Sequence, residues 1–141
     1  MDFELAPELV QIRDTVKKFC QNEVAPFAEE WEKNEHFPHE VIRKMGGLGF
    51  FASPFPEQYG GTELGFLANI IVAEELGRAS LGLACCLNMQ SGTCPMTILL
   101  NGNDTQKEKY LPGIISGDLL APPPGRAEND EGTGAVEERA G

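Results

Sequence analysis

Apolar side chains recur every three or four positions through residues 6–33, as they do along one face of an α-helix. The recurring positions are Leu9, Ile12, Val16, Phe19, Val24 and Phe27. Pro7 suits the first turn of such a helix, where its missing N–H leaves no intrahelical bond unmade. Pro26 lies inside the pattern, so we expect a kink, or a break into two helices, near Val24.

A shorter helix is predicted from Pro38, in the sequence PHEVIRKM. Its inward positions are Val41, Ile42 and Met45. The glycines that follow, Gly46, Gly47 and Gly49, are expected to end it because glycine tolerates the left-handed conformation of a helix C-cap.

Residues 50–65, FFASPFPEQYGGTELG, show no lasting period and contain two prolines and three glycines among them. This composition predicts a long ordered loop rather than a strand pair. Its four aromatic residues, Phe50, Phe51, Phe55 and Tyr59, are expected to pin the loop to the core.

Three further helices are predicted in the rest of the apolar pattern. The first spans residues 66–78, with Phe66, Ile70, Ala73 and Leu76–Gly77 on one face. The second spans residues 81–100, interrupted by Gly92 and Pro95; it is apolar nearly all round and is therefore expected to be the most buried helix. The third starts at TQKE, where Thr105 and Glu108 have the spacing of a capping box, is broken by Pro112 and ends at Gly117.

Residues 118–141 differ from the rest of the chain. They read DLLAPPPGRAENDEGTGAVEERAG and, after Leu119 and Leu120, contain Val136 as their one large aliphatic residue. So little apolar surface cannot offset the entropy of ordering the segment, and we expect disorder or folding only with a partner. The prediction is an all-α bundle over residues 1–117 with a long aromatic loop, followed by a tail over 118–141.

The charge balance narrows the classes of partner. The 141 residues carry 22 acids and 11 bases, a formal net charge of −11. Such a surface repels phosphates and anionic lipid heads, so we expect no nucleic acid or membrane partner. The N-terminal MDFELAPE has neither a basic nor an apolar signal region, and the run around IIVA is too short to span a bilayer. A cytoplasmic protein with reduced, buried thiols at Cys20, Cys85, Cys86 and Cys94 is expected.

Four groups of residues could support chemistry, and each also has a purely structural explanation. His36 and His39 have no third metal ligand at suitable spacing, and the GGLG run follows a helix, not a strand. Cys85 and Cys86 suit core packing better than redox chemistry. Glu74 and Glu75 point about 100° apart on a helix, so a solvated face or a salt bridge to Arg78 is favoured over a carboxylate dyad. The residue chemistry alone predicts no catalytic residue and no metal site.

Five ordered segments over residues 2–118 resemble the N-terminal α-helical domain of the acyl-CoA dehydrogenase family. They are IRDTVKKFCQNEVAPFAEEWE, FPHEVIRKMGGLGF, PEQYGG, AEELGRAS and LLNGNDTQKEKYLPGIISGD. Their order and spacing make the resemblance specific. LNM at 87–89 and NEHFPHE incline it towards the branch that acts on glutaryl-CoA and alicyclic acyl-CoAs.

The resemblance implies a helical domain that forms one wall of an acyl-CoA cleft, with the isoalloxazine of FAD at the thioester end. The aromatic turn would then fix the first helices against the helices that follow. The residues expected to line the acyl pocket are Leu83, Leu87, Gln90, Ser91 and Cys94. For any one of them, plain core packing remains the alternative.

The chain departs from the family pattern after Gly117. Where the family has Thr-Glu-Pro-x-(Ala/Ser)-Gly-(Ser/Asn)-Asp, this sequence has PPPGRAENDEGTGAV. The flavin-binding β-domain and the catalytic glutamate are not recognisable. We therefore expect a fragment of an FAD-dependent enzyme that desaturates acyl-CoA thioesters, inactive alone and without bound flavin. The alternative is a non-catalytic helical module that binds a partner or itself through exposed apolar faces.

Overall fold

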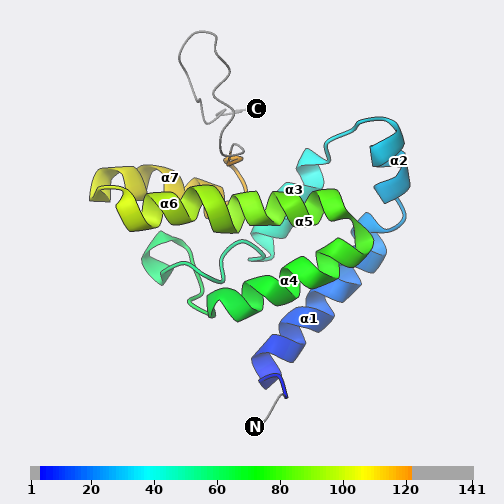
Figure 1. The fold of residues 1–141 in the computed structure, drawn as a ribbon, viewed down its shortest axis with the longest axis horizontal. Helices are drawn as coiled ribbons and strands as arrows, with labels where there is room; N and C mark the ends of the chain where they lie inside the picture. The colour runs from blue at the N-terminus through cyan, green and yellow to red at the C-terminus, as the bar shows by residue number, and fades with distance from the viewer. Residues whose placement is uncertain (1–3, 122–141) are drawn as a thin grey trace.

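The computed structural model describes residues 4–121 and contains helices and loops, without a strand in that range. Figure 1 shows the order of the elements. They are α1 (Pro7–Phe19), the π-helix η1 (Cys20–Val24), α2 (Ala28–Lys33), α3 (His39–Gly47), the 3₁₀-helix η2 (Glu57–Tyr59), α4 (Gly65–Ala79), α5 (Leu81–Leu87), the π-helix η3 (Asn88–Thr93), α6 (Cys94–Asn101) and α7 (Asp104–Ser116). The all-α prediction is confirmed.

The predicted break near Val24 is confirmed. After Phe19 the chain widens into the π-helix η1, in which the Ala25 N–H donates to the Cys20 carbonyl at 2.8 Å. Pro26 follows and has no N–H to continue the ladder, so the chain turns before α2 begins at Ala28. The turn directs α2 away from the axis of α1 (Figure 1).

Helix α3 extends to Gly47, so it includes two of the glycines that were expected to end it. Gly49 has φ +78° and makes the left-handed turn after the helix. Gly46 has a different role. A Cβ atom at this position would overlap the backbone carbonyl of Ser116 and lie 2.9 Å from the Gly117 nitrogen. The missing side chain therefore allows α3 and the end of α7 to cross at backbone contact.

The aromatic loop is pinned to the core, as predicted. Phe50, Phe51, Phe55 and Tyr59 are all buried. Within the loop, the Thr62 N–H donates to the Ala52 carbonyl at 3.0 Å and the Gly65 N–H to the Ser53 carbonyl at 2.8 Å. The aromatic side chains and these hydrogen bonds together give a fixed connection between α3 and α4 without a sheet.

The predicted inward face of α4 is wrong in its first half. Phe66 and Ile70 are 53% and 60% exposed. The side chains that face the core are Ala68, Ile71, Val72 and Leu76. Apolar residues surround much of this helix, so periodicity could not choose a face, and packing against α1 and α5 decided it.

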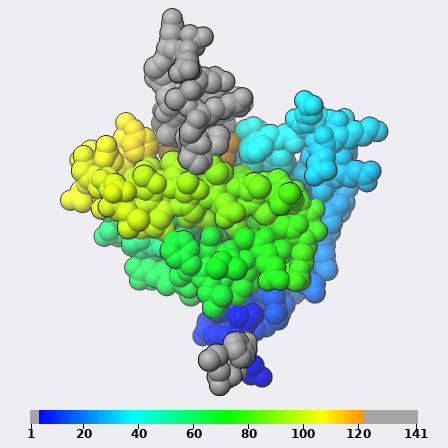
Figure 2. Space-filling view, in the orientation of Figure 1, coloured from blue at the N-terminus to red at the C-terminus, as the bar shows by residue number. Residues whose placement is uncertain are grey.

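Helices α5, η3 and α6 form one continuous 21-residue stretch across the domain, Leu81–Asn101 (Figure 1). The expectation that it is the most buried helix is wrong, because Leu81 and Leu100 are 71% and 72% exposed. One side of it packs on α4 and α7, and on the face shown in Figure 2 no other described helix lies over it. By length and hydropathy alone the stretch could cross a membrane, but core helices of soluble domains pass the same test.

Helix α7 begins with a capping box, but not with the predicted one. The Asn103 side chain accepts from the Gln106 N–H at 2.9 Å, and the Gln106 side chain accepts from the Asn103 N–H at 3.0 Å. Pro112 does not break the helix, which continues to Ser116. Gly117 then ends it in the left-handed conformation, with φ +82°, as predicted.

Two clusters of buried side chains stabilise the bundle. The larger joins α1, η1, α3, the start of the aromatic loop, α4 and α5, and includes Val16, Met45, Phe51 and Leu76. The smaller joins the rest of the aromatic loop to α7 and includes Phe55 and Leu111. Residues 118–121 also contact the domain, because the Leu119 side chain packs against Gly113. The tail was predicted to span 118–141, so its first four residues lie against the domain; the rest of it, from residue 122, lies outside the described residues.

Candidate functional site

Four of the five predicted pocket residues are enclosed by the domain itself. Leu83, Leu87, Gln90 and Ser91 are all at most 3% exposed, and Cys94 is partly buried. Leu83 and Leu87 belong to the larger core cluster. That these residues line an acyl pocket stays a prediction, and in this domain they form the packed side of the long helix.

Gln90 and Ser91 are both buried and both lie in the π-helix η3. In an α-helix, neighbours project about 100° apart, whereas a π-turn widens the helix and often marks a functional position. The sequence anticipated an interruption at Gly92 and Pro95. Instead of breaking, the helix widens just before Pro95, whose ring and missing N–H disturb the regular ladder.

The carboxamide of Gln90 is fully used. Its Nε2 donates to the Ile114 carbonyl at 2.8 Å and to the Leu119 carbonyl, and its Oε1 accepts from the Ala121 N–H at 2.9 Å. One buried side chain thus holds the end of α7 and residues 119–121, called the exit segment below. This role could not be read from the sequence, because its partners lie 24 to 31 residues away.

Ser91 connects the same turn to α4. Its hydroxyl contacts the Asn69 Oδ1 at 2.8 Å and its own helix at the Leu87 carbonyl, 2.7 Å away. Both Ser91 and Asn69 are buried. The π-turn is therefore anchored on one side to α4 and on the other to the exit segment.

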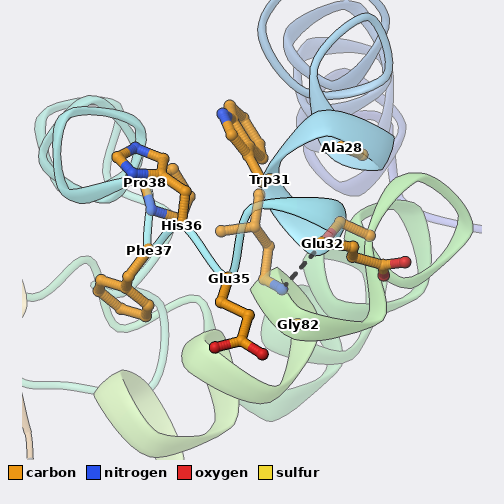
Figure 3. A pocket seen from close by; sticks show the side chains of 10 residues that line it. Ala28, Trp31, Glu32, Glu35, His36, Phe37, Pro38 and Gly82 are labelled. Atoms are coloured by element: carbon orange, nitrogen blue, oxygen red, sulfur yellow. Dashed lines mark hydrogen bonds between the residues drawn. The ribbon is translucent and has the colours of Figure 1, made fainter.

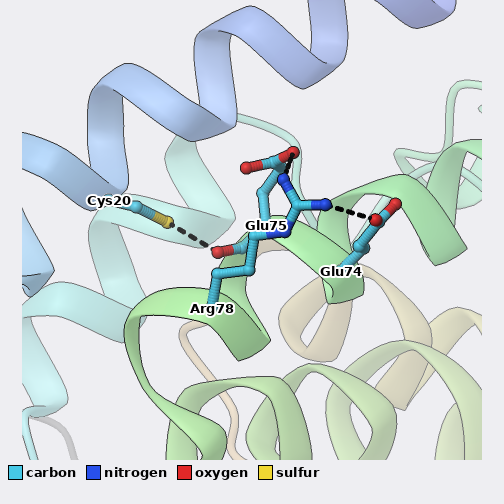
Figure 4. Close-up of polar contacts among 4 residues, drawn as sticks. All are labelled: Cys20, Glu74, Glu75 and Arg78. Atoms are coloured by element: carbon cyan, nitrogen blue, oxygen red, sulfur yellow. Dashed lines mark hydrogen bonds and ion pairs between the residues drawn. The ribbon is translucent and has the colours of Figure 1, made fainter.

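The acidic pair at the end of α4 forms the predicted salt bridges, but its burial was not predicted. Arg78 contacts Glu74 Oε1 at 2.7 Å and Glu75 Oε1 at 3.2 Å, as Figure 4 shows. Glu74 is exposed, whereas Glu75 is only 5% exposed. The two carboxylates share one guanidinium, which neutralises the buried one, so they do not form an acid–base dyad.

The cysteines are all free, but the expectation that they are all buried is wrong: Cys20 is buried and Cys85 is exposed. Cys20 donates a weak hydrogen bond to the Glu75 carbonyl, 3.6 Å away (Figure 4). Burial, with a smaller contribution from Glu75, raises the pKa of the Cys20 thiol to about 11. Burial, with a smaller electrostatic contribution from the neighbouring Cys85, raises the pKa of the Cys86 thiol to about 11. Burial also raises the pKa of Cys94.

We expect a thiol reagent at mildly alkaline pH to modify Cys85 first and Cys20 and Cys86 slowly, because the thiolate reacts and burial suppresses it at the latter two. Peptide mapping after a timed reaction measures this order. Cys85→Ser should remove the fast phase, and a fast phase that persists in this variant contradicts the assignment.

Folding stability should also fall as pH rises from about 9 towards 11, because the unfolded thiols lose protons that Cys20 and Cys86 retain in the fold.

Three surface cavities are described, of about 280, 340 and 430 Å³. The second lies between α1, the aromatic loop and α4, and includes Ser53, whose buried hydroxyl has no hydrogen-bond partner. None of the three is lined by lysine or arginine. These three cavities therefore offer no lysine or arginine side chain to pair with a pyrophosphate.

Metal ligands are not brought together in the described part of the chain, where no three His, Cys, Asp or Glu side chains form a cluster. The ring of His39 meets the Phe37 ring edge-on, with 4.7 Å between the ring centroids. His36 lies at the rim of the first cavity (Figure 3). The arrangement gives no support to a histidine metal centre.

Comparison with known proteins agrees with the helical fold described above. Residues 6–118 match the family model "Acyl-CoA dehydrogenase, N-terminal domain". The chain is 42% identical over 123 residues to glutaryl-CoA dehydrogenase of Desulfococcus multivorans. The matched region covers 85% of this chain and 32% of that protein. It is also 42% identical over 118 residues to mitochondrial isovaleryl-CoA dehydrogenase of Bos taurus, covering 82% of this chain and 28% of the relative.

A solved structure of glutaryl-CoA dehydrogenase in complex with glutaryl-CoA superposes with a TM-score of 0.83 and 42% identity, over 86% of this chain and 31% of the other. The chain thus spans about a third of the length of the relatives that it matches. The family match covers nearly all of the described helices, from the start of α1 to the turn after α7. The chain therefore belongs to the acyl-CoA dehydrogenase N-terminal domain family.

Proposed function

We propose that residues 4–121 form one wall of the acyl-binding cleft of an FAD-dependent acyl-CoA dehydrogenase, an enzyme that desaturates acyl-CoA thioesters between the α and β carbons. The observation that carries this proposal is the backbone similarity to the glutaryl-CoA complex, with a TM-score of 0.83. In such an enzyme the flavin accepts the hydride. We assign neither that step nor the proton abstraction to residues of this domain.

The uncovered apolar surface supports a role as a wall. On α4, Phe66, Leu67 and Ile70 are 53%, 52% and 60% exposed. Leu81 and Leu100, near the two ends of the α5–η3–α6 stretch, are exposed even more. Phe66, Leu67 and Ile70 are neighbours on α4 at helical spacing, and neighbouring exposed apolar side chains mark surfaces that are covered by other protein or by ligand.

The predicted pocket residues divide into two roles within this proposal. Cys94 is partly exposed, so of the five it is the one that could contact an acyl chain directly. Leu83 is buried in the larger core cluster and would support the wall from within. Leu87, Gln90 and Ser91 are enclosed and would fix the shape of the wall. Alone, the chain is expected to bind no FAD and to have no dehydrogenase activity. We also propose that the protein is located in the cytoplasm.

A chimera tests the proposal. Residues 1–118 would replace the matching N-terminal part of the Desulfococcus multivorans glutaryl-CoA dehydrogenase, and flavin content and glutaryl-CoA oxidation would be measured. We expect a yellow, active enzyme. The relative reassembled from its own segment through the same junction is the positive control, and the relative without its N-terminal part is the negative control.

A flavin-loaded, folded chimera without activity, beside an active junction control, would count against the acyl-wall role. The isolated chain is measured in parallel. Flavin bound to it, or acyl-CoA-dependent reduction of an electron acceptor by it, would contradict the expectation that it is inactive alone.

A second candidate is a non-catalytic helical module that associates with itself or with another protein. The exposed row Phe66, Leu67 and Ile70 on α4 favours it. Light scattering after size-exclusion chromatography would show a dimer that Ile70→Asp dissociates, whereas Glu74→Gln on the same helix would leave it intact. A monomer at high concentration would rule out self-association.

A further inference from the structure

The cavity of about 280 Å³ lies where α2, the α2–α3 connection and the start of α5 meet (Figure 3). Trp31 projects from α2, Phe37 from the connection, and Glu35 points towards the ribbon of α5 near Gly82 (Figure 3). Its size suits a small ligand rather than an acyl-CoA. Its lining combines aromatic rings with two carboxylates, those of Glu32 and Glu35.

The aromatic rings are held in place by neighbouring rings. Trp31 stacks on Phe27 at 6.0 Å between centroids, with 25° between the ring planes. Phe37 meets His39 edge-on at 4.7 Å. Trp31 also packs against the larger core cluster, whereas Phe37 is 45% exposed, so the indole is the better supported of the two π surfaces. The negative face of an aromatic ring attracts a positive charge, most strongly in tryptophan.

The charge at the cavity has one sign. Glu32 and Glu35 line it, and neither lysine nor arginine does. Neither carboxylate takes part in any of the ion pairs found among residues 4–121. The field at the cavity therefore favours a cation and opposes the phosphates of coenzyme A.

The backbone at Glu35 is unusual for this residue type. The His36 N–H donates to the Trp31 carbonyl at 2.8 Å and the Glu35 N–H to the Glu32 carbonyl at 3.3 Å, the pattern that ends a helix with a left-handed residue. Glycine is the usual residue there, yet Glu35 has φ +51°. Glu35 therefore adopts a backbone conformation that its residue type disfavours, and in this position its carboxylate lines the cavity.

We propose that this cavity binds a small organic cation with a methylated ammonium group, held between the rings of Trp31 and Phe37 and neutralised by Glu32 and Glu35. A compact metal ion fits less well, because two carboxylates and apolar walls do not complete a coordination shell. A methylated ammonium matches both features, since it has an apolar surface and a diffuse charge. The site is independent of the dehydrogenase role proposed above.

Choline is the probe, and dimethylbutanol, its uncharged isostere with carbon in place of nitrogen, is the matched control. Trp31 is the only tryptophan of the chain, so its indole N–H resonance reports on this cavity alone. We expect a saturable shift of that resonance with choline, with a dissociation constant in the millimolar range, and no saturable shift with dimethylbutanol.

Variants separate charge from ring contributions. Glu35→Gln should weaken choline binding about fivefold, and Phe37→Leu, which keeps the apolar bulk, by a similar factor. Glu40→Gln is the control, because Glu40 is exposed, lies in the first turn of α3 and does not line the cavity. Far-UV circular dichroism verifies that each variant is folded.

Equal shifts with choline and dimethylbutanol would overturn the proposal in favour of an unselective apolar pocket. Equal weakening by Glu35→Gln and Glu40→Gln would reduce the effect to the net charge of the protein and would also overturn it. So would the lack of any saturable shift with choline.

Discussion

Replacing Gly46 by alanine is expected to lower the free energy of unfolding by about 3 kcal/mol, the upper part of the range for overpacked sites. The added Cβ would overlap the Ser116 carbonyl and approach the Gly117 nitrogen to 2.9 Å. Both are backbone atoms, so no side-chain rotation can relieve the clash. The end of α7 must move away from α3, which would disturb the close packing around Gly117, where the Ile42 carbonyl and the Phe51 ring leave little room for a side chain.

Gly47→Ala is the matched control. Gly47 occupies the next position in α3, and a Cβ there would meet nothing within 4 Å. Since alanine is the better helix former, this variant should gain up to about 1 kcal/mol. Urea unfolding followed by circular dichroism at the helical band measures both variants. Gly46→Ala with wild-type stability would show that α3 and α7 are not in backbone contact.

Removing the polar end of Gln90 is expected to be the second large effect. Gln90→Met keeps the length of the side chain but leaves the Leu119 carbonyl and the Ala121 N–H without their partner. The Ile114 carbonyl retains a hydrogen bond from the Gly117 N–H at 3.2 Å. We expect a loss of about 1 to 2 kcal/mol, because partly buried groups left unpaired carry part of their desolvation cost.

Local exchange identifies the cause of that loss. Hydrogen exchange at the Ala121 amide should become much faster in Gln90→Met. Amides inside α1 should exchange faster only in proportion to the loss of global stability. Asn88→Ala is the control, since Asn88 is exposed in the same π-turn, and it should change stability by less than about 0.5 kcal/mol. Unchanged exchange at Ala121 in the methionine variant would show that Gln90 does not hold the exit segment.

The two variants probe how the domain ends. Gly46 lets the last turn of α7 approach α3, and Gln90 holds residues 119–121 beneath the π-turn. In the relatives that are about three times as long, the rest of the protein continues beyond the matched region. A defined exit direction suits the proposed role as one wall of a larger cleft.

Residue patterns close together in the chain determined the helical class and most element boundaries. The break at Pro26, the left-handed cap at Gly117 and the buried aromatic loop follow from local backbone and side-chain properties. The salt bridges of Arg78 followed from helical spacing alone. The family resemblance also depended only on the order of short segments.

Tertiary structure decided which of several locally possible arrangements forms. Apolar residues surround α4, so packing against α1 and α5 chose Ala68 and Val72 over Phe66 and Ile70. The network of Gln90 and the backbone contact of Gly46 join residues that are 24 or more positions apart. Local propensity carries no information about such partners, because their free energy arises only when distant segments meet.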